Sequence, residues 1–253
     1  MTIESESENQ LVLVATDERV AIVTLNNPPA HVLSRTMTDE LIRAFEDLRR
    51  LDLAAVIITG RGSHFFCAGA DIRELVQNSP LENRAYFSRL YYALNLVSTC
   101  RFPVIAAVNG YAFGAGLDLA LCADIRVMDR NTQMCGTGVN LNLVFCTQRL
   151  ARLVGPGRAK DMLLRARRMG AEEALQIGLV EHVAEPGEAV REAEVIARQI
   201  SSKGQSAVRR VKQVIDAGLE LPLEDALNLE AEAIYEMFAS SEFKRRAQAF
   251  LAR

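Results

Sequence analysis

The residues best suited to chemistry lie in two glycine-containing turns, each of which follows a short apolar run. The first turn spans residues 66–71 and follows the run at residues 55–59. The second follows the run at residues 104–108 and contains Gly114 and Gly116. Glycine lets the backbone turn tightly and approach another group closely. Two such turns can each offer a backbone N–H to one carbonyl oxygen, which is how enzymes stabilise the oxyanion of acyl transfer or of an enolate.

An acidic side chain accompanies the second turn. A helical pattern begins at Ala115, and Asp118 falls on its first turn. The first N–H groups of a helix lack intrahelical partners, and the helix dipole makes that end positive. One interpretation of Asp118 is therefore a carboxylate that complements the dipole. The other is a general acid/base that moves a proton next to a carbonyl group whose oxygen is held in place.

The elements that must position these turns alternate between strand and helix. Strands are predicted at residues 11–15, 20–25, 55–59, 104–108 and 125–128, and helices at about 34–51 and 81–100. The first two strands read as a hairpin, and the prolines in residues 26–33 predict an ordered loop. Apolar strands separated by helices predict an α/β core.

After residue 185 the sequence pattern becomes entirely helical. Helices are predicted at residues 186–200, 204–217, 223–238 and 241–251. Amphipathic helices of this kind need a surface to cover. We therefore expect two parts, an α/β core at residues 1–185 and a helical segment at residues 186–253.

The composition excludes several classes of protein. The chain has 253 residues, 49% of them hydrophobic, and a net charge of −3 without a basic block, so we expect no nucleic-acid partner. No apolar stretch is long enough for a membrane span. The start, MTIESESENQ, resembles neither a signal peptide nor a transit peptide, and the five cysteines show no C-x-x-C spacing. These features predict a cytoplasmic protein with reduced cysteines.

Several segments resemble the crotonase superfamily, the enoyl-CoA hydratases and isomerases. The similar segments are FCAGADIREL (66–75), AAVNGYAFGAGLDLALCADIRV (106–127), TQRLARLVGPGRAKDMLL (147–164), AEEALQIGLVEHV (171–183) and the closing AQAFLAR. The resemblance covers nearly the whole chain. It implies a spiral of repeated ββα units, a homotrimer or dimer of trimers built partly by the C-terminal helices, and an acyl-CoA substrate. Coenzyme A is then part of the substrate, and no separate cofactor is expected.

The resemblance also assigns residues to the site. It implies an oxyanion hole formed by the backbone N–H groups of Ala70 and Ala115, with Asp118 as the acid/base. Hydratases of the family usually carry Glu at that position, whereas dienoyl-CoA isomerases carry Asp. Substrate contacts are implied at Ala30, His31, Val32, Ala68, Ile72, Gly114, Phe250 and Arg253. Alternatively, His31 is a hydrogen-bonded loop histidine, Phe250 a core anchor and Arg253 a solvated charge.

The chain departs from the family at the second catalytic acid. That acid normally lies in a segment like P-E-V-N-L-G-L-I-P-G-A-G-G-T-Q-R-L. Matched on V-N-L, Gly138 takes its place; matched without gaps from T-Q-R-L, Cys135 does. No Asp or Glu occurs anywhere in residues 130–160. The missing acid disfavours the two-carboxylate arrangement that positions water for hydration, and it favours a one-base reaction or a different substrate.

Two function hypotheses remain. The first is an enoyl-CoA hydratase/isomerase-type enzyme that uses Asp118, with Glu74 as a distant second candidate for the base. The second is a CoA-binding paralogue with little or no turnover. A dinucleotide site is excluded because Leu119 stands where the G-x-G-x-x-G pattern needs its last glycine. No His, Cys and acid spacing typical of a metal site is visible, so we expect no metal.

Overall fold

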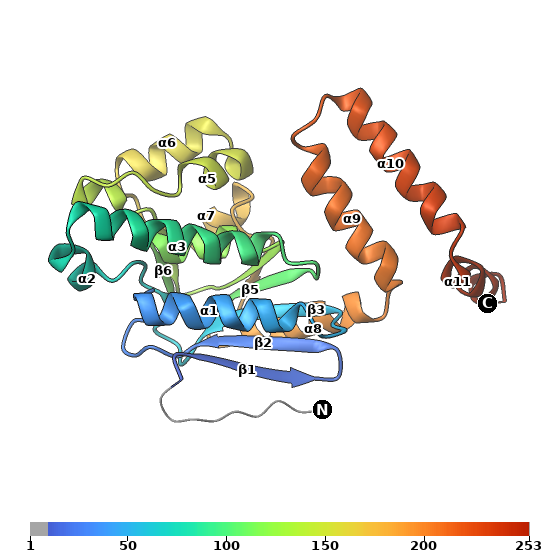
Figure 1. Cartoon of the computed structure of the whole chain (residues 1–253), viewed down its shortest axis with the longest axis horizontal. Helices are drawn as coiled ribbons and strands as arrows, with labels where there is room; N and C mark the ends of the chain where they lie inside the picture. Colours follow the sequence, from blue (N-terminus) through green and yellow to red (C-terminus); the bar gives the residue numbers. More distant parts are fainter. Residues whose placement is uncertain (1–9, 253) are drawn as a thin grey trace.

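Two sheets form the core of the computed structural model, which describes residues 10–252 (Figure 1). The larger sheet has the order β1 (Val12–Asp17), β2 (Val20–Leu25), β3 (Ala55–Gly60), β5 (Val104–Val108), β7 (Ile125–Asp129) and β10 (His182–Ala184). The smaller sheet has the order β4 (Phe65–Cys67), β6 (Tyr111–Phe113), β8 (Gln133–Cys135) and β9 (Met169–Gly170). The predicted hairpin is the antiparallel pair of β1 and β2.

Successive strands alternate between the two sheets. The strands β3, β5 and β7 belong to the larger sheet, and the strand after each of them, β4, β6 or β8, belongs to the smaller one. These strands pair in parallel within each sheet, as Val56 does with Val104 and Ala112 with Met134. Parallel neighbours require crossover connections, which helices supply here. The chain therefore forms the spiral of ββα units that the resemblance implies.

Helices lie between and around the strands. They are α1 (Arg35–Leu48), α2 (Ile72–Gln77), α3 (Pro80–Ser98), α4 (Ala115–Leu121), the 3-10 helix η1 (Gly138–Leu141), α5 (Thr147–Val154), α6 (Pro156–Leu164), α7 (Ala171–Gln176), α8 (Ala189–Ser201), α9 (Gln205–Gly218), α10 (Leu223–Phe238) and α11 (Ser241–Leu251). Local signals fix some of their starts. Ser79 and Glu82 form a capping box at α3, with a proline in its first turn.

The parallel strands at the centre are covered on both faces. Every residue of β3 and β5 is buried. In β3, Val56 and Ile58 belong to one apolar cluster with α1 and α3, whereas Ala55 and Ile57 belong to a second cluster with α8. Continuous burial explains why these strands read as unbroken apolar runs. It also holds rigid the strands that lead into the two glycine turns.

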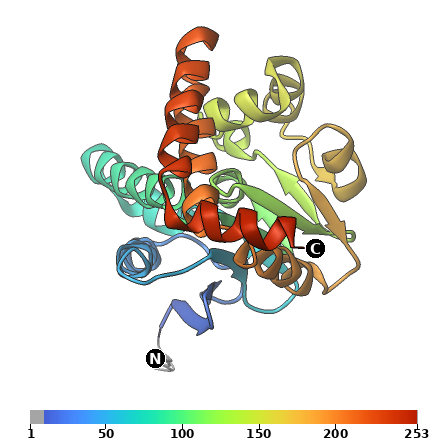
Figure 2. The same ribbon diagram turned by 90° about the vertical axis from the view of Figure 1, so that its right-hand side faces the viewer.

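The last three helices extend from the core as an arm. Helix α8 covers the sheet, whereas α9, α10 and α11 stand apart from it (Figure 1). Figure 2 shows these three helices from their outer side, in front of the core. The base of α9 is tied to the core by Lys212, whose Nζ lies 2.6 Å from Asp124 Oδ2, and by Arg209, which pairs with Asp52. Between residues 10 and 252, none of the helices is both long and apolar enough to cross a membrane.

Candidate active site

The two glycine turns meet in the structure. Gly69 has a φ of +106°, and a Cβ built on it would lie 3.1 Å from the nitrogen of Ala115. A Cβ built on Gly116 would overlap the carbonyl oxygen of Cys67. Any larger residue at these positions would push the turns apart. Their glycines therefore allow the end of β4 and the start of α4 to come into direct contact.

Each turn presents a backbone N–H without a protein acceptor. Ala115 is the first residue of α4, after Gly114 with a φ of +52°, so its N–H precedes the intrahelical hydrogen bonds. Ala70 follows Gly69, whose carbonyl accepts from the Leu33 N–H at 2.7 Å. Among residues 10–252, neither Ala70 nor Ala115 donates its N–H to a protein atom. Two free N–H groups on adjoining turns are suited to one shared oxyanion.

Asp118 lies one helical turn after Ala115 and is buried. Its side chain is 3% exposed, and its Oδ2 lies 3.4 Å from Nη1 of Arg149 on α5. Its Oδ1 is buried and has no hydrogen-bond partner among the described residues. Burial raises the pKa of the Asp118 carboxyl above its ordinary value, and the Arg149 guanidinium opposes this rise. A buried carboxylate with one free oxygen and a raised pKa has the properties of a general base.

Groups that are neutral at pH 7 complete the surroundings of Asp118. Burial raises the pKa of Tyr91 on α3, of Cys122 after α4 and of Cys146 before α5, and Asp118 contributes to each rise. The Cys146 thiol donates to the carbonyl oxygen of Gly114 at 3.1 Å, on the same peptide that carries the Ala115 N–H. This hydrogen bond helps to fix the orientation of that peptide.

Residues 135–138, where the family normally carries its second acid, lie against the second turn. The carbonyl oxygen of Cys135 accepts from the Gly114 N–H at 2.9 Å, and a Cβ on Gly114 would lie 3.0 Å from Oγ1 of Thr137. A Cβ on Gly138 would lie 2.8 Å from the carbonyl oxygen of Leu143, so the backbone there leaves no space for a longer side chain. The Cys135 thiol instead donates to the carbonyl oxygen of Ala166. Neither position supplies an acid.

The proposed contacts of the coenzyme are partly brought together. The Ala68 N–H donates to the carbonyl oxygen of Ala30 at 2.9 Å, which places Ala30 to Val32 beside the first turn. The His31 ring is buried: its Nδ1 accepts from the Asn27 N–H, so its Nε2 donates to the carbonyl of Arg61. Burial lowers the pKa of His31, which keeps the ring neutral. These contacts fit the interpretation of a hydrogen-bonded loop histidine, and leave the backbone of the loop to meet a ligand.

The other residues that the sequence analysis assigned to the site are exposed, lie outside the described residues, or hydrogen-bond to another part of the protein. Ile72 begins α2 and is 40% exposed. Phe250 is exposed on α11, the last helix of the arm, and Arg253 lies outside the described residues. Glu74 accepts from the Arg35 N–H at 3.1 Å. Within residues 10–252, no three His, Cys, Asp or Glu side chains are grouped so that they could hold a metal ion.

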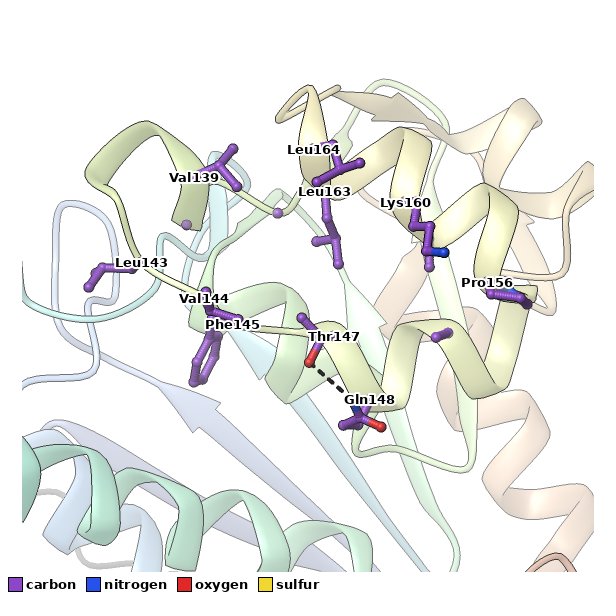
Figure 3. A pocket seen from close by; sticks show the side chains of 14 residues that line it. Val139, Leu143, Val144, Phe145, Thr147, Gln148, Pro156, Lys160, Leu163 and Leu164 are labelled. Atoms are coloured by element: carbon purple, nitrogen blue, oxygen red, sulfur yellow. Dashed lines mark hydrogen bonds between the residues drawn. The ribbon is translucent and has the colours of Figure 1, made fainter.

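An apolar cavity of about 320 Å³ adjoins the segment after β8. Figure 3 shows side chains from η1, the linker after it, α5 and α6 around this space. Gly136 and Gly138 line it and flank Thr137, the residue beside Gly114. The cavity is therefore close to the turn that carries Ala115, although sequence reasoning did not identify it.

Comparisons with known proteins identify the family of the chain. Residues 15–253 match the family model described as enoyl-CoA hydratase/isomerase. The chain is 36% identical to the short-chain-enoyl-CoA hydratase of Clostridium acetobutylicum and 37% identical to the crotonyl-CoA hydratase of Syntrophomonas wolfei, in each case over 95% of this chain and 94% of the relative.

Solved structures have the same fold. An enoyl-CoA hydratase from Bacillus anthracis superimposes with a TM-score of 0.93 at 32% identity, over 96% of both chains. DspI of Pseudomonas aeruginosa superimposes with a TM-score of 0.94 at 34% identity, over 99% of this chain and 97% of its own. The family model, the identities and the shared fold together show that the chain belongs to the enoyl-CoA hydratase/isomerase family of enzymes, the crotonase superfamily.

Proposed function

We propose that the chain acts on an acyl-CoA thioester, and that Asp118 moves a proton while the N–H groups of Ala70 and Ala115 hold the thioester oxygen. One observation carries the proposal. Among residues 10–252, the N–H groups of Ala70 and Ala115 lie on adjoining turns and have no protein acceptor. Helix α4, which begins at Ala115, also carries the buried carboxylate of Asp118, whose Oδ1 has no hydrogen-bond partner among these residues. The printed names of the relatives, among them enoyl-CoA and crotonyl-CoA hydratases, support the substrate class.

The site favours a one-base proton shuttle. The Asp118 carboxylate takes a proton from the carbon next to the thioester carbonyl, and the electron pair of the broken C–H bond forms the enolate. The two N–H groups stabilise the negative oxygen. Asp118 then returns the proton to the γ carbon, so that the double bond moves and no other reactant is consumed. Hydration needs a group that positions water, and residues 130–160 contain no acid for that role.

A panel of thioesters tests this function. We expect conversion of 3-enoyl-CoA or dienoyl-CoA substrates to isomers of equal mass, and slower addition of water to crotonyl-CoA. Chromatography with mass spectrometry separates the two outcomes, because hydration adds the mass of one water. If calorimetry shows that acetoacetyl-CoA binds but no thioester is turned over, the chain is instead a CoA-binding paralogue. If acetoacetyl-CoA does not bind at millimolar concentration, the acyl-CoA proposal itself fails.

The helical arm supports a proposal about assembly. Large apolar side chains of α9, α10, α11 and the turn after α9 are exposed in the single chain; they include Val211, Ile215, Leu219, Leu223, Leu227, Ile234, Tyr235, Phe238, Phe243 and Phe250. An apolar surface of this extent indicates a protein partner. We expect a homotrimer or a dimer of trimers, in which Phe250 and Arg253 reach the coenzyme of a neighbouring subunit. Light scattering should give three or six times 27.9 kDa, and a monomer at micromolar concentration would contradict the proposal.

The proposed mechanism uses no resident cofactor, because coenzyme A enters as part of the substrate. All five cysteines are free and buried, which supports the expected cytoplasmic location.

A further inference from the structure

Arg149 connects Asp118 to a second helix. Its Nη1 lies 3.4 Å from Asp118 Oδ2, and its Nη2 donates to Asn95 Oδ1 on α3 at 2.7 Å. The guanidinium is planar and presents its donors in a fixed arrangement, so these two contacts restrict its orientation. Three helices, α3, α4 and α5, are joined at this point by one side chain.

The contact with Arg149 gives the two oxygens of the Asp118 carboxylate different surroundings. Oδ2 faces Arg149, whereas Oδ1 is buried and has no hydrogen-bond partner within residues 10–252. A buried oxygen that makes no hydrogen bond destabilises the folded state, and a catalytic role is one reason why a native protein retains such a group. We propose that Arg149 is a positioning residue: it holds Oδ2 and leaves Oδ1 as the atom that takes and returns the proton. This inference rests on the proposed role of Asp118.

Arg149 is also the charge that opposes the burial of Asp118. The other titratable groups that face the carboxylate are Tyr91 on α3, Cys122 after α4 and Cys146 before α5, and all three are neutral at pH 7. A cation close to a carboxylate favours its ionised form. Loss of the guanidinium should therefore raise the pKa of Asp118 further and leave less of the base ionised at a given pH.

The test compares the pH dependence of kcat/KM in matched variants. In Arg149→Gln we expect the acid limb of the profile, where kcat/KM falls as Asp118 is protonated, to move up by about one pH unit, because the carboxylate loses its cation. We also expect the plateau value of kcat/KM at higher pH to fall roughly tenfold, because Asp118 loses its fixed orientation. Arg149→Lys keeps a charge and should leave the limb near its original pH. Arg152→Gln is the control, since Arg152 is exposed on the same helix and pairs with Glu220. An unchanged limb and plateau in Arg149→Gln would overturn the inference.

A second variant covers the case in which Arg149→Gln does not fold. Asn95 is exposed on α3, so Asn95→Ala should fold, and freeing the guanidinium should move the limb in the same direction by a smaller amount. The Asp118 carboxyl carbon can also be titrated by nuclear magnetic resonance and assigned by its absence in Asp118→Asn. This measurement needs no turnover. If no thioester reacts, the proposed function fails, while an Asp118 pKa that is equal in wild type, Arg149→Gln and Asn95→Ala independently refutes the role of Arg149.

Discussion

Replacing Asp118 by Asn is expected to lower turnover of the best thioester by roughly two to four orders of magnitude, while acyl-CoA binding survives. The amide keeps the size of the side chain and much of its hydrogen bonding but cannot accept the substrate proton as a base. Glu74, the distant second candidate, is bound to the Arg35 N–H at the start of α1.

The competing role for Asp118 has a different signature. A carboxylate that only complements the helix dipole is worth roughly 0.3 to 1 kcal/mol of stability, and its loss leaves the rate per folded molecule almost unchanged. The thermal midpoint, the affinity for acetoacetyl-CoA and the turnover number of the one variant separate the two roles. Wild-type turnover in Asp118→Asn would show that Asp118 is not the catalytic acid/base.

The long strands and helices of this fold could be predicted from sequence, whereas the short strands could not. Residues 55–59 and 104–108 form continuous apolar runs because β3 and β5 are covered on both faces, and that pattern is visible in one sequence. The strands β4, β6 and β8 have three residues each, too few to show a period. They exist because successive turns of the spiral place them side by side.

In the site, features marked by local sequence could be predicted, whereas contacts between distant residues could not. Glycine marks the two turns in the sequence, because few other residues allow backbones to approach so closely. The contact of Asp118 with Arg149 joins residues 31 positions apart, and no local pattern predicts it. The sequence shows only that Arg149 lies in a stretch without acids, residues 130–160, so that a carboxylate partner could come only from outside that stretch. The position of Thr137 beside Gly114 could not be predicted from the sequence either, because it depends on how the segment after β8 packs against the start of α4.

Replacing Ala115 by Pro should remove one donor of the oxyanion hole and keep the helix that carries Asp118. Proline has no N–H, and it is tolerated at the first position of a helix because the N–H there has no intrahelical partner. This chain already uses the arrangement: Pro156 begins α6 directly after Gly155, which has a φ of +83°. Ala115 likewise follows a glycine with positive φ, and its N–H donates to no protein atom within residues 10–252.

Loss of one oxyanion donor costs about two to three orders of magnitude in turnover, and we expect that loss in Ala115→Pro. Ala115→Ser is the matched control, because it also adds atoms at a buried position but keeps the N–H. Circular dichroism and the thermal midpoint establish that each variant is folded, and binding of acetoacetyl-CoA, whose enolate mimics the intermediate, should weaken in the proline variant more than in the serine variant. If folded Ala115→Pro turns over substrate within a few-fold of Ala115→Ser, the Ala115 N–H does not hold the oxyanion and the two-turn mechanism is wrong.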